Sequence, residues 1–127
     1  MARSKSTAEQ RRYPRVPEVL PVAVARGSWQ FRAKTVNVSC GGVLCVVGHP
    51  LPLMTRVALT LELPRRLVRC RGAVVRCRPA AAARGQRRSQ AYRVAVLFME
   101  MKPEDHRAVA EFVLQSMLGG RRDRRRR

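Results

Sequence analysis

The sequence predicts a mainly β protein, a small six-stranded antiparallel β-barrel followed by one C-terminal α-helix. Six short runs of apolar residues are separated by glycine and proline turn signals, which is typical of small antiparallel barrels. After Pro103 the apolar period changes to the spacing of an amphipathic helix. At 127 residues the chain is long enough for one modest core but not for two. We therefore expect a single domain.

Alternating apolar residues and β-branched runs place the six strands at residues 19–26, 29–36, 43–47, 56–63, 67–77 and 92–98. The alternation is clearest in the fourth strand, where every second residue from Val57 to Leu63 is apolar. In the fifth strand the inward set begins with Val68 and continues at the opposite parity with Val75. We therefore predict a β-bulge at Gly72-Ala73.

The last regular element is predicted to be a helix that begins at Pro103. Glu104 and Asp105 place negative charge at the positive end of its dipole. The stripe expected to pack against the sheet consists of Val109, Phe112, Val113, Ser116 and Met117. We expect a flexible segment at residues 1–10, the domain at 11–118 and a disordered arginine-rich tail at 119–127. The alanine- and arginine-rich stretch 79–90 is expected to be a mobile loop.

Charge is the most unusual property of the composition. The chain has 27 Lys and Arg against 8 Asp and Glu, a net charge of +19. This balance predicts an anionic partner, which could be a nucleotide, a nucleic acid, or an acidic protein or membrane surface. No apolar run is long enough to cross a bilayer, and the first residues lack a signal-peptide pattern. We expect a soluble cytoplasmic protein.

The residues give little support for an enzyme, a cofactor or a metal site. No Ser/His/Asp or Cys/His set, carboxylate pair or Walker loop is present. Four cysteines, Cys40, Cys45, Cys70 and Cys77, contain no C-x-x-C pair, so we expect neither zinc nor disulfides. His49 lies in a proline-bracketed loop and is expected to face solvent.

Two polar stretches are candidates for ligand binding. The first, Asn37-Val-Ser-Cys-Gly-Gly42, joins two strands, and its glycines allow positive φ while Asn37 and Ser39 can bond to local backbone. Beyond a turn, its amide, hydroxyl and bare backbone N–H groups suit a planar polar ligand or a phosphate. The second, residues 11–17, contains two prolines and is expected to be an extended strap without helix or strand pairing. Arg11 and Arg15 lie four residues apart on it.

The order of these parts resembles the PilZ domain, a bacterial receptor module for the second messenger cyclic di-GMP. The family's signatures are R-x-x-x-R and [D/N]-x-S-x-x-G. They stand here as Arg11-Arg-Tyr-Pro-Arg15 and Asn37-Val-Ser-Cys-Gly-Gly42, separated by two strands. Tyr92-Arg-Val-Ala-Val-Leu-Phe98 is a further similarity. The resemblance covers about residues 10 to 118.

The resemblance implies a non-enzymatic receptor that grips cyclic di-GMP between the strap and the barrel and signals through an unidentified protein partner. The residues implied to bind the ligand are Arg11, Arg15, Asn37, Ser39 and Gly42, with Arg12 and Gly41 as further candidates. The arginines would contact phosphates and the guanine O6/N7 edge and stack on bases, and Gly42 would keep the floor of the site clear of side chains. Asn37 stands where the family more often has Asp, which implies weaker binding.

Two other functions remain open. One is a PilZ-type adaptor that binds proteins without nucleotide. The other is nucleic-acid binding through residues 65–93, which hold ten arginines and no acidic residue, together with the tail. No aromatic platform separates these arginines, so a solvated surface is the favoured interpretation of this stretch.

Overall fold

The computed structural model describes residues 13–80 and 91–120 of the chain. The predicted flexible segment 1–10, the strap residues Arg11 and Arg12, and residues 121–127 of the predicted tail lie outside the described residues. Residues 81–90, most of the loop expected at 79–90, also lie outside them.

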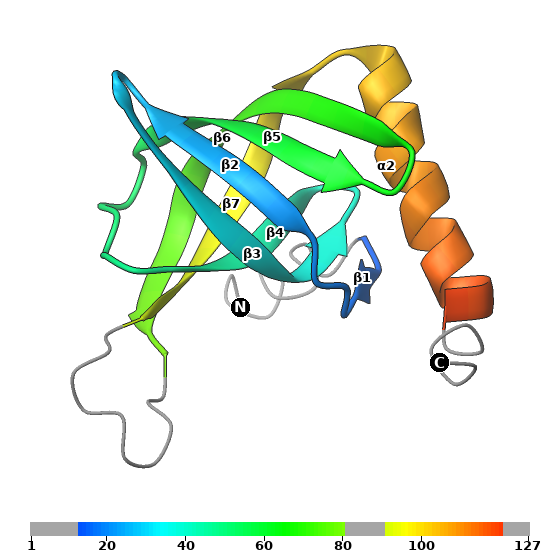
Figure 1. The fold of residues 1–127 in the computed structure, drawn as a ribbon, viewed down its shortest axis with the longest axis horizontal. Helices are drawn as coiled ribbons and strands as arrows, with labels where there is room; N and C mark the ends of the chain where they lie inside the picture. The colour runs from blue at the N-terminus through cyan, green and yellow to red at the C-terminus, as the bar shows by residue number, and fades with distance from the viewer. Residues whose placement is uncertain (1–12, 81–90, 121–127) are drawn as a thin grey trace, which may run out of the picture.

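Within the described residues, six long strands close into an antiparallel barrel, which confirms the predicted fold (Figure 1). The strands are β2 (Pro21–Arg26), β3 (Trp29–Ser39), β4 (Gly42–Val47), β5 (Arg56–Leu63), β6 (Arg66–Pro79) and β7 (Tyr92–Met101). They pair in the order β3-β2-β5-β6-β7-β4, and β3 also pairs with β4, which closes the sheet. A two-residue strand, β1 (Arg15–Val16), pairs with the end of β3.

The barrel interior is filled by the inward-facing residues of every long strand. β5 is the most regular strand, because Val57, Leu59, Leu61 and Leu63 are all buried. Its bounds are those predicted from the sequence. Burying an aliphatic side chain of this size stabilises the fold by about 1.5–3 kcal/mol. The alternation of apolar residues therefore determined both the position and the facing of this strand.

Strand β6 contains a bulge, but not where we predicted it. Its register with β7 shifts between Arg71 and Gly72 because Met99 is an extra residue on β7, and shifts between Val74 and Arg76 because Val75 is an extra residue on β6. The bulge of β6 therefore lies at Val75 and not at Gly72-Ala73. Val74 is fully buried and Val75 is 46% exposed, so the expectation that Val75 faces inward is wrong. The inward parity of Val68 and Cys70 continues through Gly72 to Val74, and Val75 is the extra residue that interrupts it.

Helix α2 (Pro103–Gln115) packs against one end of the barrel and continues into a π-helical turn, η1 (Ser116–Gly120). Val109 and Val113 are buried in the core, and Phe112 packs against it. Met117 is 54% exposed, so its predicted place on the packed stripe is wrong. A π turn spaces its hydrogen bonds five residues apart, which changes the phase of side chains after residue 115.

The first turn of α2 is anchored to the β5–β6 hairpin. Asp105 is only 7% exposed, and its Oδ1 accepts hydrogen bonds from Nη2 of Arg66 at 2.8 Å and from Nε at 3.0 Å. From the sequence we expected this carboxylate to interact with the dipole of the helix. In the structure its main partner is the guanidinium of Arg66 on β6. The ion pair fixes the helix against the barrel end.

His49 does not face solvent as expected. Its ring stacks on Trp29 with centroids 4.3 Å apart and meets the edge of Phe31 at 4.6 Å. Nε2 is buried and has no hydrogen-bond partner among the described residues. The two prolines correctly indicated a loop, but the aromatic residues that cover it come from the β2–β3 hairpin.

The four cysteines are free thiols. Burial raises the pKa of Cys45 to about 11, and burial together with the nearby charge of Asp105 raises that of Cys70 to about 12. The described part of the chain contains no group of three or more His, Cys, Asp or Glu residues that could hold a metal ion. None of the helices in the described part is long and apolar enough to span a membrane.

The anchor between Arg66 and Asp105 predicts a difference between two neighbouring arginines. Arg66→Ala leaves a buried carboxylate unpaired, so we expect it to lower the free energy of unfolding by about 1–3 kcal/mol. Arg65→Ala, the matched control, removes an exposed arginine for which the described residues provide no acidic partner, and should change stability by no more than about 0.5 kcal/mol. Urea unfolding of both variants measures this. Equal, small effects would show that the pair does not anchor α2.

Candidate ligand-binding site

The strap pairs with the barrel through β1. Arg15 lies opposite Ser39 and Val16 opposite Val38 in an antiparallel pairing with β3. We expected the prolines to prevent such pairing, and this expectation is wrong. Pro14 and Pro17 flank the two paired residues without interrupting them, so both keep a backbone N–H.

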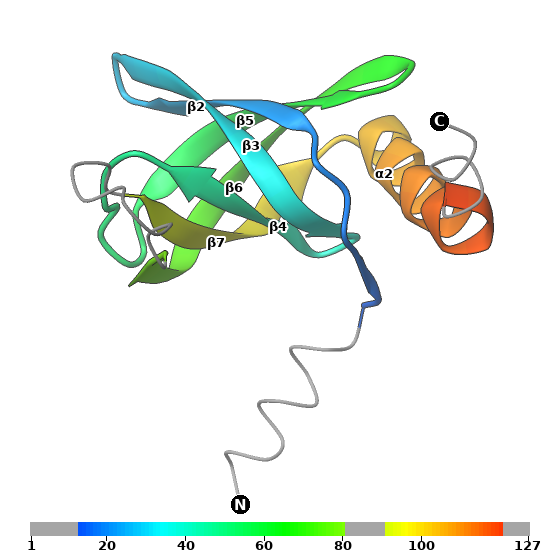
Figure 2. The ribbon, with the colours of Figure 1, turned by 60° about the horizontal axis from the view of Figure 1, so that its bottom comes forward.

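This pairing brings Arg15 of the first sequence motif and Ser39 of the second to one face of the sheet. Val16 and Val38 are buried, so the residues paired beside them, Arg15 and Ser39, lie on the outer face. Asn37 precedes Ser39 by two residues and lies on the same face. Figure 2 shows β1 beside the end of β3, next to the β3–β4 turn.

A bulge in β3 sets this facing. The register with β4 shifts between Thr35 and Asn37, so that Val36 is an extra residue. Thr35 and Val38 are both buried although they are three residues apart. Without the extra residue, regular alternation would turn Val38 outward and Asn37 inward.

The β3–β4 turn is shorter and more fully bonded than predicted. Only Cys40 and Gly41 separate the two strands, and the N–H groups of Gly41 and Gly42 donate to Oγ of Ser39 at 3.1 and 3.2 Å. The backbone amides that we expected to be bare are therefore bonded. The Ser39 hydroxyl also lies 3.3 Å from the Gly42 carbonyl oxygen, so this side chain organises the turn.

The two glycines are required by close approach and not by positive φ. Among the described glycines only Gly27 has a positive φ. A Cβ on Gly42 would lie 2.3 Å from the backbone oxygen of Val96 on β7. A Cβ on Gly41 would lie 2.8 Å from Cδ2 of Tyr13, whose ring covers the turn. Gly42 thus lets two strands meet, and Gly41 lets the strap dock.

An apolar surface adjoins the polar groups on the same outer face. Leu44 lies opposite Asn37 on β3 and opposite Ala95 on β7, while Leu97 lies opposite Gly42. Leu97 is 48% exposed. The methyl group of Ala95 also lies on this outer face, because its neighbours Val94 and Val96 are buried. Sequence reasoning missed this surface, although the unbroken apolar run of β4 was a signal of a strand covered on both sides.

The segment that connects the strap to β2 is held from two sides. The buried hydroxyl of Thr35 donates to the Glu18 carbonyl oxygen at 2.6 Å and accepts from the N–H of Leu20 at 2.8 Å. The Glu18 carboxylate accepts a hydrogen bond from the hydroxyl of Ser116, at the end of α2. The strap is therefore linked both to the barrel wall and to the C-terminal helix.

A family model described as the PilZ domain matches residues 9–115, most of the chain. The chain belongs to the PilZ family. No protein with a curated description matches it. The family match covers both motifs and every strand of this PilZ domain.

Solved structures with the same fold include three PilZ proteins. The PilZ domain of YcgR from Escherichia coli, solved with c-di-GMP, has a TM-score of 0.73 and 14% identity, covering 93% of this chain and 98% of that one. The inhibitor of motility from Bacillus subtilis has a TM-score of 0.70 and 20% identity, covering 85% and 51%. The K. pneumonia MrkH–c-di-GMP complex has a TM-score of 0.71 and 16% identity, covering 89% and 55%. The present chain spans about half the length of the last two.

The structure of this PilZ domain brings most of the predicted site residues together. Arg15, Asn37 and Ser39 share the outer face, and Gly41 and Gly42 form the adjoining turn. Arg11 and Arg12 lie outside the described residues. Tyr13 was not predicted as a site residue, and it covers Gly41 at the edge of this face.

The two adjacent glycines should respond differently to the same substitution. Gly42→Ala meets backbone that cannot yield, so we expect a loss of about 1–3 kcal/mol in unfolding free energy. Gly41→Ala meets a movable ring, so it should leave global stability within about 0.5 kcal/mol but release the strap. Urea unfolding and amide hydrogen exchange at residues 15–16 and 38–39 distinguish the two effects.

A double variant tests the assignment of Tyr13. If Gly41 is small because the Tyr13 ring packs on it, the amide hydrogens of residues 15–16 should exchange no faster in the Gly41→Ala/Tyr13→Ala double variant than in Tyr13→Ala alone. Additive increases in exchange would contradict the packing of Tyr13 on Gly41.

Proposed function

We propose that this PilZ domain is a non-enzymatic receptor for cyclic di-GMP, which binds on the outer face between the strap and the β3–β4 turn. The observation that carries the proposal is the pairing of Arg15 with Ser39, because it joins one residue of the strap motif to one residue of the barrel motif. Two of the solved PilZ structures with this fold contain c-di-GMP, which supports the same ligand here.

Arginine chemistry fits the two halves of this ligand. Cyclic di-GMP carries two phosphate charges and two guanine bases. The Arg15 guanidinium can form paired hydrogen bonds to a phosphate or to guanine O6 and N7, and its plane can stack on a base. Arg11 and Arg12 add positive charge to the same strap. The apolar surface formed by Leu44 and Leu97 offers a base a flat contact that excludes water.

Asn37 and Ser39 supply the neutral polar contacts. The Asn37 amide can both accept from guanine N–H groups and donate to guanine O6. Ser39 holds the N–H groups of Gly41 and Gly42 around one oxygen atom. If the hydroxyl turns toward the ligand, both N–H groups become available to a phosphate oxygen. Within the described part of the chain Ser39 bonds to backbone groups only, and we assign it no nucleophilic role.

The output of such a receptor is a change in protein contacts. Glu18 connects the strap segment to Ser116 of the C-terminal helix. A ligand that moves the strap therefore alters a contact of the helix end, where a downstream protein partner could read it.

Calorimetric titration of the purified chain with cyclic di-GMP tests the proposal. We expect measurable binding heat for the wild type and at least a roughly tenfold loss for Arg15→Ala, since charge-assisted hydrogen bonds contribute about 1.5–3 kcal/mol each. Arg26→Ala is the matched control, because this exposed arginine pairs with Trp29 at the opposite end of β3. Flat wild-type titrations would reject the receptor function and favour an adaptor that binds proteins only.

Substitution of Asn37 tests its assigned contact. A carboxylate accepts from both guanine N1–H and N2–H, so Asn37→Asp should preserve or tighten binding, while Asn37→Ala should weaken it. The same titration measures both variants. A large loss for Asn37→Asp alone would mean that Asn37 faces a phosphate, where a negative charge repels the ligand.

A further inference from the structure

Two rows of side chains cross the outer face of four neighbouring strands. The first row comprises Arg32 on β3, Ala23 on β2, Thr60 on β5 and Arg69 on β6. The second row comprises Gln30, Ala25, Ala58 and Arg71 on the same strands. On β5 and β6 the residues that flank these positions are buried, and on β2 Val22 and Val24 are buried, so the row side chains face outward. Each row has a small centre and an arginine on its β6 side.

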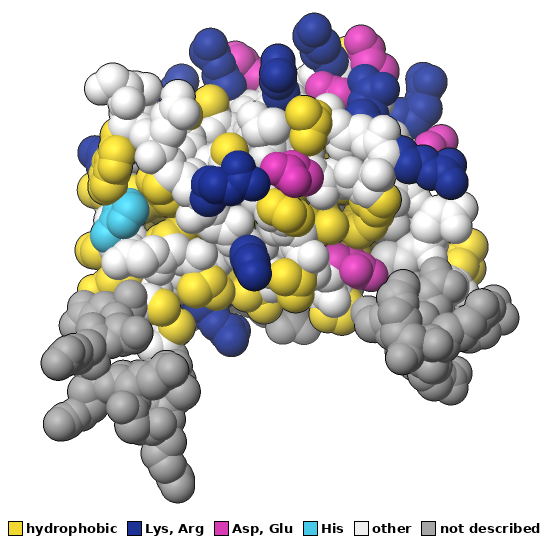
Figure 3. All heavy atoms as spheres, viewed as in Figure 1, with side chains coloured by type: hydrophobic (Ala, Val, Ile, Leu, Met, Phe, Trp, Pro, Cys, Tyr) yellow, Lys and Arg dark blue, Asp and Glu magenta, His cyan; other side chains and the backbone are white. Residues whose placement is uncertain are grey.

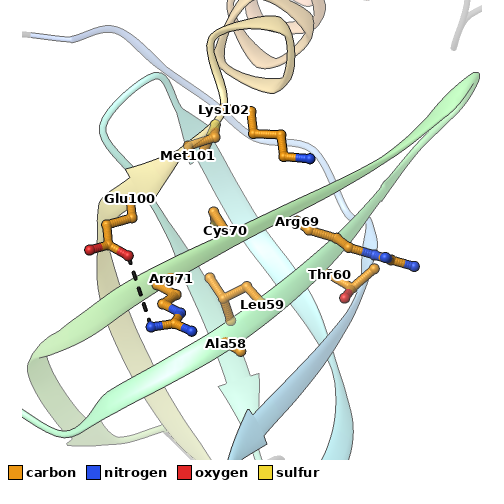
Figure 4. A pocket seen from close by; sticks show the side chains of 9 residues that line it. All are labelled: Ala58, Leu59, Thr60, Arg69, Cys70, Arg71, Glu100, Met101 and Lys102. Carbon is orange, nitrogen blue, oxygen red and sulfur yellow. Dashed lines mark ion pairs between the residues drawn. The ribbon is translucent and has the colours of Figure 1, made fainter.

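A hollow of about 500 Å³ adjoins the β6 side of these rows (Figure 4). Arg69, Arg71 and Lys102 surround it, and Thr60 contributes its hydroxyl. Among the described residues that line the hollow, Glu100 is the only acidic one. We call the surface formed by the two rows, Lys34 and Lys102 the basic face.

The positive charge of the basic face is weakly compensated within the described residues. Arg32 contacts Glu62 at 3.1 Å, and Arg71 lies 4.0 Å from Glu100. These side chains are exposed, with values of 70% for Arg32 and 75% for Arg71, so neither ion pair contributes much energy. Arg69, Lys34 and Lys102 have no acidic partner in the described part of the chain. Figure 3 shows Lys and Arg side chains at the centre and along the upper edge of this view.

We propose that the basic face binds the phosphate backbone of double-stranded nucleic acid. β3 and β6 are three strand spacings apart, so the flanking cations are separated by about 14 Å along the curved wall of the barrel. The two sides therefore present their cations to different phosphates of a duplex, which carries one negative charge per about 1.7 Å of helix axis. Arginine forks, the Thr60 hydroxyl and the Gln30 amide all donate to phosphate oxygens. Contacts of this kind carry no sequence specificity.

The centre of the basic face favours a nucleic acid over a lipid surface. Binding in a membrane interface depends on large apolar side chains that enter the acyl region. The two rows contain only alanines and Thr60 between their polar ends. Small residues instead allow a rigid duplex to approach the sheet closely. Within the described residues of the stretch 65–93, Arg66 is bound to Asp105 and is not part of the basic face.

Fluorescence anisotropy with a labelled duplex DNA of about 20 bp tests the proposal, using the full chain at roughly 50 to 200 mM salt. Replacing Arg69 and Arg71 by Gln removes two phosphate contacts, so the log–log salt slope should fall by about 1.8. We expect at least a roughly tenfold loss of affinity at low salt. Replacing Arg78 and Arg93 by Gln is the matched control. These two exposed arginines lie opposite each other in the β6–β7 strand pairing, away from the basic face. Their replacement removes the same amount of positive charge.

The Thr60→Glu variant and a titration with cyclic di-GMP serve as two further tests of the proposal. Thr60→Glu places a negative charge at the centre of the face and should weaken duplex binding without removing a cation. Titration with cyclic di-GMP should be unchanged in all these variants, which shows that they fold and separates this test from that of the receptor function. Equal losses in the two arginine double variants would overturn the proposal. So would tighter, Arg69- and Arg71-dependent binding to vesicles of phosphatidylcholine and phosphatidylglycerol.

Discussion

The extra residue in β3 is the constraint on which the candidate site depends. Thr35 and Val38 both point inward, and the bulge at Val36 is what permits this. Because Val38 is buried, it can pair with the buried Val16 and hold the strap in register. The same register turns Ser39 outward beside Arg15. A one-residue slip would reverse every one of these facings at once.

Local pattern was sufficient to predict the barrel, but not the contacts that form between distant strands. β5 was predicted to the residue, because each inward position carries Val or Leu and each outward position carries alanine or a polar residue. Val75 was misplaced, because it is the extra residue of the bulge in β6, and the sequence pattern placed that bulge at Gly72-Ala73. Tyr13 was missed as a partner of Gly41, since nothing near it in sequence indicates that a ring lies over that turn. The motif glycines were recognised, but the reason for them was steric and not conformational.

The composition predicts the total charge of the protein, but the strand register decides which charged side chains lie together. A net charge of +19 predicts an anionic partner and cannot say which arginines act together. Cross-strand pairing assigns Arg69 and Arg71 to the same face as Arg32, although nearly forty residues separate them. The neighbouring Arg66 is instead bound to a buried carboxylate and serves the fold. Adjacent arginines in one hairpin therefore have different physical roles.

The strap is held by contacts with the protein itself, and this affects how a bound ligand can be sensed. Tyr13 packs on Gly41, Val16 packs beside Val38, and Thr35 bonds to the Glu18 carbonyl. These contacts order the strap as part of folding, so a ligand need not supply that ordering free energy. A ligand that binds two conformations of a protein equally well cannot shift the equilibrium between them. On the proposed function, a signal must therefore arise where the ligand competes with existing bonds. Ser39 is such a place, because its hydroxyl already holds the two turn amides.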